Sequence, residues 1–152
     1  MENATGEWLA ALILDHLDLL AAAATATALA QVPWYQTFPP AAVREMFRQS
    51  YRALAQVFPT HDITPMRRYV EEVITERLRS GAPAEGLIAV ATILEDEVHR
   101  LIERESRDDP RRAADAARQL MAVTKNMRMI MSGINLRLLT ERAPGPRRPD
   151  QG

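Results

Sequence analysis

The sequence predicts an all-α protein. Apolar residues recur at steps of three and four along the long segments, the period of one helix face, and alternating strand patterns are absent. Aromatic residues make up only 5% of the chain while Ala, Leu and Arg are abundant, which favours helices over sheets. With 152 residues, we expect one helical domain over residues 1–142 and a flexible Pro/Arg tail or linker over residues 143–152.

The first predicted helix spans residues 5–31. Its amino-terminal half carries an apolar stripe that includes Trp8 and Leu12, and an Ala/Thr tract at residues 21–30 continues it. Pro33 follows directly and cannot continue a helix, because proline lacks the amide proton and clashes with the preceding turn. The sequence therefore predicts that the helix ends there.

An aromatic segment over residues 33–40 follows this helix. It contains Trp34, Tyr35 and Phe38, and the two prolines at its end prevent it from being a regular helix. We expect these aromatic side chains to fill the core between helices. The next helix begins after the prolines, and its amphipathic stripe ends at Pro59.

The helix predicted from Thr64 to Gly81 carries one cation on its apolar face. Thr64 is a suitable cap with Pro65 at the first helical position, and Gly81 suits a left-handed end. Arg77 shares the face of the apolar residues Met66, Tyr69, Val70, Val73, Ile74 and Leu78. A guanidinium keeps its charge, so it must meet a carbonyl, a carboxylate or a bound anion, or extend to solvent. An internal Glu partner and solvent exposure remain the structural alternatives to a ligand.

Two long helices end the predicted domain. The first runs from Pro83 to Glu105, and the second begins at the cap formed by Asp109 and Pro110 and continues to about Arg142. The last helix would be about 45 Å long at 1.5 Å per residue. Its apolar stripe is wider than one core-facing side requires, which indicates two packing partners.

We therefore predict a homodimer in which the last two helices of each subunit form a four-helix bundle. The residues expected at the interface are Leu94, Leu101, Met121, Met127, Ile130, Met131 and Ile134. The methionines among them suit an adaptable surface. The alternative is a long helix that simply covers the first helix.

Composition excludes several classes of protein. The chain has no cysteine, so disulfides, thiolate zinc sites and cysteine nucleophiles are excluded, and a cytoplasmic location is expected. The first apolar run is interrupted by Asp15, His16 and Asp18, so we expect neither a signal peptide nor a membrane span. The formal net charge is -1, with both signs mixed along the chain, so nucleic acid is not an expected partner.

Enzyme chemistry finds little support in the sequence. The only local cluster of titratable residues is Glu95, Asp96, Glu97 and His99. Asp96 and His99 have the spacing seen in di-iron bundles, but the second copy of that motif is missing, and a solvated helix face explains the cluster better. Histidine phosphotransfer through His99 or His16 is a further alternative that lacks the expected surroundings. We expect no catalytic residues, no metal and no cofactor.

In the order of its helices the chain resembles globin-type sensor domains, most of all the N-terminal non-haem globin domains of stressosome proteins of the RsbR kind. The resemblance covers roughly Trp8 to Leu139. In globin-coupled haem sensors, the helix before the long pair carries the proximal histidine four residues ahead of a glycine. Here Arg77 stands in that place ahead of Gly81. The matching run is Glu76, Arg77, Leu78, Arg79, Ser80, Gly81, Ala82 and Pro83, continuing into Leu87 and Ile88.

The resemblance implies a globin-like bacterial sensory module that is dimeric, binds no haem and acts with stressosome-type or other signalling partners. A haem-binding globin sensor is the alternative, although neither His61 nor His99 occupies the position of the proximal histidine, four residues ahead of the glycine. We hypothesise that an acidic or amphipathic small ligand near Arg77 and Tyr69 changes how the last helix crosses its partner. The signal would then leave through the last two helices.

Overall fold

The computed structural model describes residues 3–142 as six α-helices and one short 3₁₀ helix, with no strand in this range. The elements are α1 (Ala4–Asp15), α2 (Leu17–Gln31), η1 (Pro33–Thr37), α3 (Pro40–Ala55), α4 (Thr64–Arg79), α5 (Ala84–Glu105) and α6 (Pro110–Arg142). The predicted all-α class is confirmed. The tail predicted over residues 143–152 lies outside the described residues.

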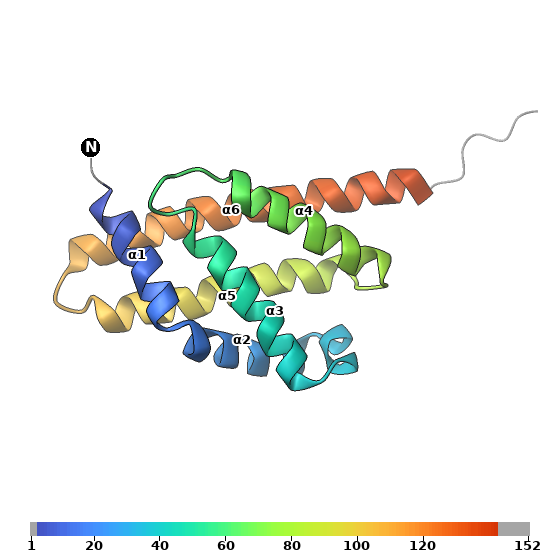
Figure 1. Cartoon of the computed structure of the whole chain (residues 1–152), viewed down its shortest axis with the longest axis horizontal. Coiled ribbons are helices and arrows are strands. Elements are labelled where there is room, and N and C mark those ends of the chain that lie inside the picture. Colours follow the sequence, from blue (N-terminus) through green and yellow to red (C-terminus); the bar gives the residue numbers. More distant parts are fainter. Residues whose placement is uncertain (1–2, 143–152) are drawn as a thin grey trace, which may run out of the picture.

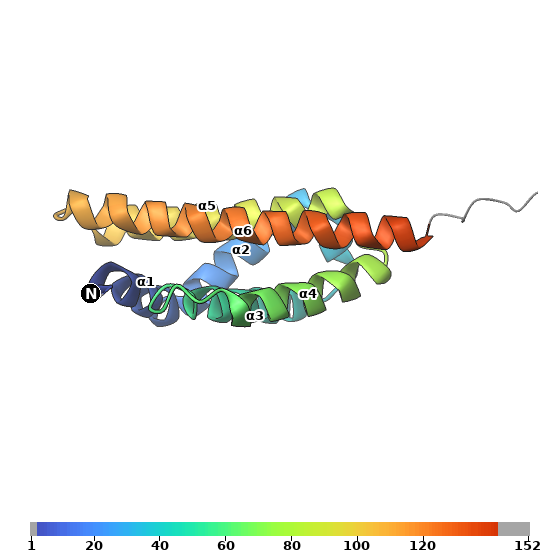
Figure 2. The same ribbon diagram turned by 90° about the horizontal axis from the view of Figure 1, so that it is seen from above.

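The helices form two layers. The long helices α5 and α6 run antiparallel, side by side, and make one layer (Figure 1). Viewed from above, α1, α3 and α4 make the other layer, and α2 crosses from α3 to α5 (Figure 2). Helix α6 contacts α5 in its own layer and α1 and α4 in the opposite one. The wide apolar stripe of α6 is therefore largely used within the subunit.

The single helix predicted over residues 5–31 is wrong. The chain forms α1 and α2, which are bent by 71° at a break at His16. The backbone N–H of His16 bonds to the Leu12 carbonyl oxygen at 3.2 Å, and its imidazole Nδ1 lies 2.9 Å from the same oxygen. No proline or glycine marks this break. The bend lets α1 pack on α3 and α6 while α2 packs on α3 and α5, so tertiary contacts decide it.

Most of the predicted helix ends agree with the structure to within one or two residues. Gly81 has φ 94°, the left-handed conformation expected after α4, and the Asp109 carboxylate caps α6 by accepting a backbone hydrogen bond of 3.0 Å. Thr64 is not the cap of α4, because Ile63 occupies that position. The Asp62 carboxylate accepts a bond of 3.0 Å from the Thr64 N–H, which lowers the pKa of Asp62.

The aromatic segment fills the core as predicted and forms η1. The ring of Tyr35 is buried and stacks on Phe47 of α3, with 6.1 Å between the ring centroids. Trp34 meets Tyr35 edge-on at 5.1 Å and Phe38 at 4.8 Å. This packing directs the Tyr35 hydroxyl toward α4, where it becomes part of the candidate site.

The amino terminus of α1 is held against the loop between α3 and α4. The Asn3 side chain caps α1 by accepting a bond of 3.0 Å from the Gly6 N–H, and its amide donates to the Phe58 carbonyl oxygen at 2.6 Å. Gln119 of α6 donates to Asn3 at 3.2 Å. A Cβ atom at Gly6 would collide with the Phe58 carbonyl oxygen. Glycine is therefore required for this close approach.

A second anchor of α1 is expected to depend on pH. A side-chain hydrogen bond from Thr5 lowers the pKa of Asp115 on α6 below its ordinary 3.8. A carboxylate with a lowered folded pKa stabilises the fold above its unfolded pKa and loses this effect as pH falls through the folded value. We expect Asp115→Asn to lower the free energy of unfolding near neutral pH by less than about 1 kcal/mol, because the site is largely exposed.

Urea denaturation of the Asp115→Asn variant and the wild type at several pH values measures this difference. It should shrink as the pH falls below the ordinary pKa of aspartate. A difference that stays constant down to strongly acidic pH would contradict an ionic role for Asp115.

Candidate ligand site and oligomer surface

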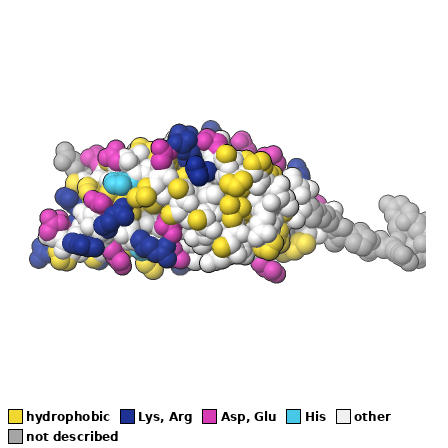
Figure 3. Space-filling view, turned by 90° about the horizontal axis from the view of Figure 1, so that it is seen from below, with side chains coloured by type: hydrophobic (Ala, Val, Ile, Leu, Met, Phe, Trp, Pro, Cys, Tyr) yellow, Lys and Arg dark blue, Asp and Glu magenta, His cyan; other side chains and the backbone are white. Residues whose placement is uncertain are grey.

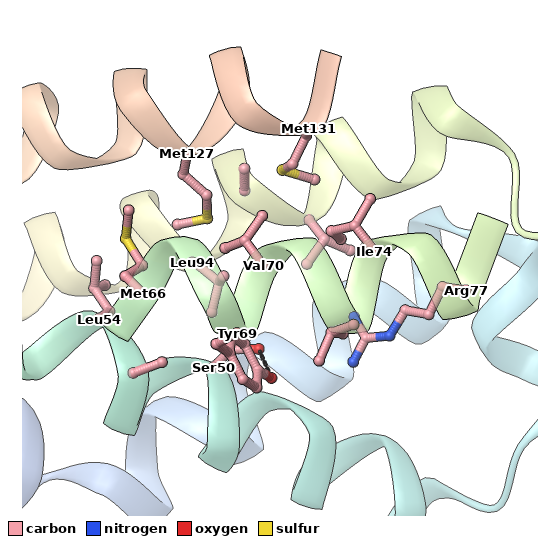
Figure 4. A pocket seen from close by; sticks show the side chains of 14 residues that line it. Ser50, Leu54, Met66, Tyr69, Val70, Ile74, Arg77, Leu94, Met127 and Met131 are labelled. Atoms are coloured by element: carbon pink, nitrogen blue, oxygen red, sulfur yellow. Dashed lines mark hydrogen bonds between the residues drawn. The ribbon is translucent and has the colours of Figure 1, made fainter. Parts of the chain in front are cut away.

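A small apolar cavity lies where α3, α4, α5 and α6 meet (Figure 4). Its walls come mainly from aliphatic and methionine side chains, and both predicted ligand residues, Tyr69 and Arg77, line it. The cavity volume is about 30 Å³, room for one or two water molecules. A larger molecule would need the lining methionines Met66, Met127 and Met131 to move, which their unbranched side chains permit.

Arg77 lies at one end of this cavity, and its guanidinium is turned back toward Tyr69 (Figure 4). The side chain is half-buried, and Nη1 donates a hydrogen bond of 3.0 Å to the hydroxyl of Tyr35. The guanidinium carbon is also 5.8 Å from the centroid of the Tyr35 ring. Because this distance is near the outer limit for cation–π attraction, the hydroxyl contact is the stronger link.

The positive charge of Arg77 has no carboxylate partner within residues 3–142. Burial raises the pKa of the Tyr35 phenol, and the guanidinium only opposes this shift, so the phenol is neutral at neutral pH. The alternative of an internal Glu partner does not describe the side chain within these residues, whereas its intermediate exposure agrees with a side chain that extends along its methylenes toward solvent. The edge of the cavity therefore carries one fixed, uncompensated positive charge.

Tyr69 is held by a hydrogen bond of 3.0 Å with Ser50 of α3. The Ser50 hydroxyl also lies 3.0 Å from the Met46 carbonyl oxygen. Since a carbonyl only accepts and serine has one proton, Ser50 donates to Met46 and Tyr69 donates to Ser50. The Tyr69 oxygen keeps its acceptor capacity. The structure thus brings the two predicted ligand residues to one cavity wall, each fixed by a neighbouring hydroxyl.

A polar cluster joins α5 to α6. The Glu95 carboxylate accepts hydrogen bonds from the Thr124 hydroxyl and from Nη1 of Arg128, the latter at 3.1 Å. Nε2 of His99 lies 3.9 Å from the same carboxylate. The partner of His99 is thus Glu95 and not Asp96, which is exposed. Interpreting this cluster as a solvated helix face is therefore only partly right, because Glu95 links two helices.

In the described part of the chain, no three His, Asp or Glu side chains are grouped so that they could hold a metal ion. Nor does any single helix there combine the length and apolar character that crossing a membrane requires. Helices α1 and α2 meet that test only when taken together across their bend.

Five of the seven residues predicted for the dimer interface are already buried inside the subunit. They are Leu94, Leu101, Met127, Met131 and Ile134. Ile130 packs partly against the core, and Met121 is 55% exposed. Intramolecular packing between the two layers therefore covers these five residues, so only Met121 and Ile130 of the predicted set still present surface to a second subunit. The alternative contact of α6 with the first helix is also present.

A different set of apolar side chains remains uncovered on the layer of α5 and α6, and we call it the outer apolar row. It consists of Ile88 on α5 and Met121, Met129, Leu136 and Leu139 on α6. At 100° per residue, the four residues of α6 fall within about 80° of one another, turned away from its buried face. In the sequence, the only indication of this row was that the apolar stripe of the last helix is wider than one buried face requires.

A groove between α2 and α5 opens on another side of the molecule. It is lined by Leu19, Leu20 and Ala23 of α2 and by Glu97, Arg100, Leu101 and Arg104 of α5. The face over α2 mixes basic and acidic side chains toward the end where α2 begins (Figure 3). The groove therefore offers no single sign of charge to a partner.

Comparisons with models of known protein families, with curated proteins and with solved structures give no match for this chain. Its function must therefore be inferred from the cavity, the charge of Arg77 and the outer apolar row.

Proposed function

We propose that this protein is a dimeric, non-haem, globin-like sensory module that binds a small anionic ligand and relays the signal through α5 and α6. Support for the globin-like part comes from Arg77. The resemblance puts an iron-binding histidine at this step of the chain, and Arg77 does line a cavity between α4 and the long helices. A non-catalytic role in signalling with protein partners follows from the resemblance, and the cytoplasmic location is based on the absence of cysteine from the chain.

The cavity does not fit a haem. No histidine is among the side chains that line it, and the guanidinium that stands in the corresponding place is a donor without a lone pair for iron. These residues favour the non-haem form over the haem-binding alternative.

The observation that carries the ligand proposal is the half-buried charge of Arg77 beside apolar walls. An anionic head group would accept charge-assisted hydrogen bonds from the guanidinium, and an apolar body would lie against the methionines of the cavity. Met127 and Met131 belong to α6, so a ligand too large for movement of their side chains alone would shift α6 against α4 and α5. A ligand that binds better to the shifted state changes the surface offered to a second subunit.

The fluorescent probe 1-anilinonaphthalene-8-sulfonate tests this site because it joins an anionic sulfonate to apolar rings. We expect the wild type to bind it, and Arg77→Leu to bind it about tenfold or more weakly, since a charge-assisted hydrogen bond is lost. Arg79→Leu is the matched control, because Arg79 is exposed on the same helix and absent from the cavity wall. Circular dichroism checks that each variant keeps its helices.

Two results would contradict the proposal. If Arg77→Leu is more stable than the wild type and binds the probe equally well, Arg77 is a structural residue. If sedimentation analysis finds a single subunit even at high protein concentration, the dimeric relay fails independently of the ligand.

A further inference from the structure

The outer faces of α5 and α6 carry charges of opposite sign. On α5, Asp96 and Glu103 are exposed and lie seven residues apart, so they share one face, and the exposed Arg100 between them is paired with Glu97. On α6, Arg118 and Lys125 are exposed with the same spacing, and no acidic residue occurs between residues 116 and 140. Within the described residues, Asp96, Glu103 and Lys125 form no ion pair, whereas Arg118 lies 3.5 Å from the carboxylate of Asp115.

The contacts between α5 and α6 place these charges at matching positions along the helix axes, and we call such a position the height of a residue. Glu95 is bonded to Thr124 and Arg128, so the turn of Asp96 lies level with the turn of Lys125. The helices are antiparallel, and Glu103, two turns further along α5, is therefore level with Arg118, two turns earlier on α6. Each acidic residue thus has a basic residue at its own height on the neighbouring helix.

We propose that the partner of this layer is a second copy of the chain, related by a two-fold axis that runs parallel to α5 and α6. This inference rests on the dimer proposed above and specifies its geometry. Rotation about such an axis keeps every residue at its height and places α5 of one subunit on α6 of the other. Asp96 then faces Lys125 of the partner subunit, and Glu103 faces Arg118 of the partner subunit.

A two-fold axis perpendicular to the helices is disfavoured by the same charges. It would place α5 against α5 and α6 against α6, so acidic faces would meet acidic faces and basic faces would meet basic ones. The parallel axis avoids this repulsion. It also covers the outer apolar row of both subunits, which supplies the apolar centre that an interface requires.

The parallel axis has a consequence for signalling. Both copies of α6 run in the same direction, so their carboxyl ends leave the dimer on the same side. A shift of α6 caused at the cavity in either subunit would therefore be delivered at one end of the assembly.

Charge reversal tests the axis. We expect Asp96→Lys and Lys125→Glu each to raise the dimer dissociation constant about tenfold or more, because each creates two like-charge contacts per dimer. The double variant should return to within about threefold of the wild type. Arg68→Glu, a reversal at an exposed position on α4, should leave the constant unchanged. Sedimentation equilibrium gives the constants, and the exposed positions leave folding intact.

The outcomes separate this inference from the dimer itself. Tighter association of Lys125→Glu would indicate the perpendicular axis, because basic faces would then already oppose each other. If none of the charge reversals changes the dimer dissociation constant, the proposed orientation is wrong, although the protein is still a dimer. A wild type that stays monomeric would overturn both.

Cross-linking gives an independent measurement, since the chain has no cysteine of its own. Under oxidation, an equal mixture of Asp96→Cys and Lys125→Cys subunits should yield a disulfide-linked dimer. Either variant alone should remain largely uncross-linked, because each position faces the other type of residue across the parallel axis. Cross-links confined to identical positions would contradict the parallel axis.

Discussion

Replacing Met127 by Ala is expected to lower the free energy of unfolding by about 2–5 kcal/mol, the range for truncating a buried Met. Met127 is only 6% exposed and lies between the two layers, where it lines the cavity. Truncation removes apolar contacts and enlarges a void that the surrounding helices cannot fully close. Urea denaturation, monitored by the circular dichroism signal of the helices, measures this decrease in the free energy of unfolding.

Met129→Ala is the matched control, two residues further along α6. Its side chain is 63% exposed, so the free energy of unfolding of the subunit should change by no more than about 0.5 kcal/mol. Its dimer dissociation constant should rise, because Met129 belongs to the outer apolar row. Equal losses of stability for both variants would mean that α6 is rotated relative to the core described above.

Gly6→Ala is expected to destabilise the fold by about 2–3 kcal/mol, within the range for overpacking a close contact. The new methyl group would collide with the Phe58 carbonyl oxygen and with the side chain of Asn3. The backbone of Phe58 cannot rotate away as a side chain can. The variant must therefore move α1 away from the loop and weaken the hydrogen bonds of Asn3.

Gly133→Ala is the control for this substitution and should have the opposite sign. Gly133 is an exposed residue inside α6, and apart from its chain neighbours and the backbone of its own helix no atom lies within 4 Å of the position its Cβ would take. Alanine there should stabilise the helix by about 0.5–1 kcal/mol, since glycine loses more backbone entropy on folding. Thermal unfolding of both variants gives the comparison. If Gly6→Ala is neutral, the contact between α1 and Phe58 is not as close as described.

The ends of the helices could be predicted because they depend on local chemistry. Proline at residue 33, glycine at residue 81 and aspartate at residue 109 each act on their own turn of the chain, and the structure agrees at all three. The break at His16 has no such residue. It depends on where α3 and α6 receive the two halves of the helix, so the sequence pattern continued straight through it.

The candidate site was predicted in part. Arg77 and Tyr69 were identified because a cation and a phenol on an apolar helix face are conspicuous by spacing alone. The Tyr35 hydroxyl that receives the Arg77 guanidinium was not foreseen. It comes from a segment 42 residues away, and only the packing of η1 against α4 brings the two together.

The sequence by itself determined an all-α chain, the order of its helices and the presence of one fixed charge on an apolar stripe, because periodicity, proline and charge act over a few residues. Only the tertiary structure decided which half of the wide stripe on α6 is core and which is surface. Met127 and Met129 are chemically identical and two residues apart, and their burial differs because α6 is covered on one side by the opposite layer. Long-range packing sets that rotation, and no local pattern records it.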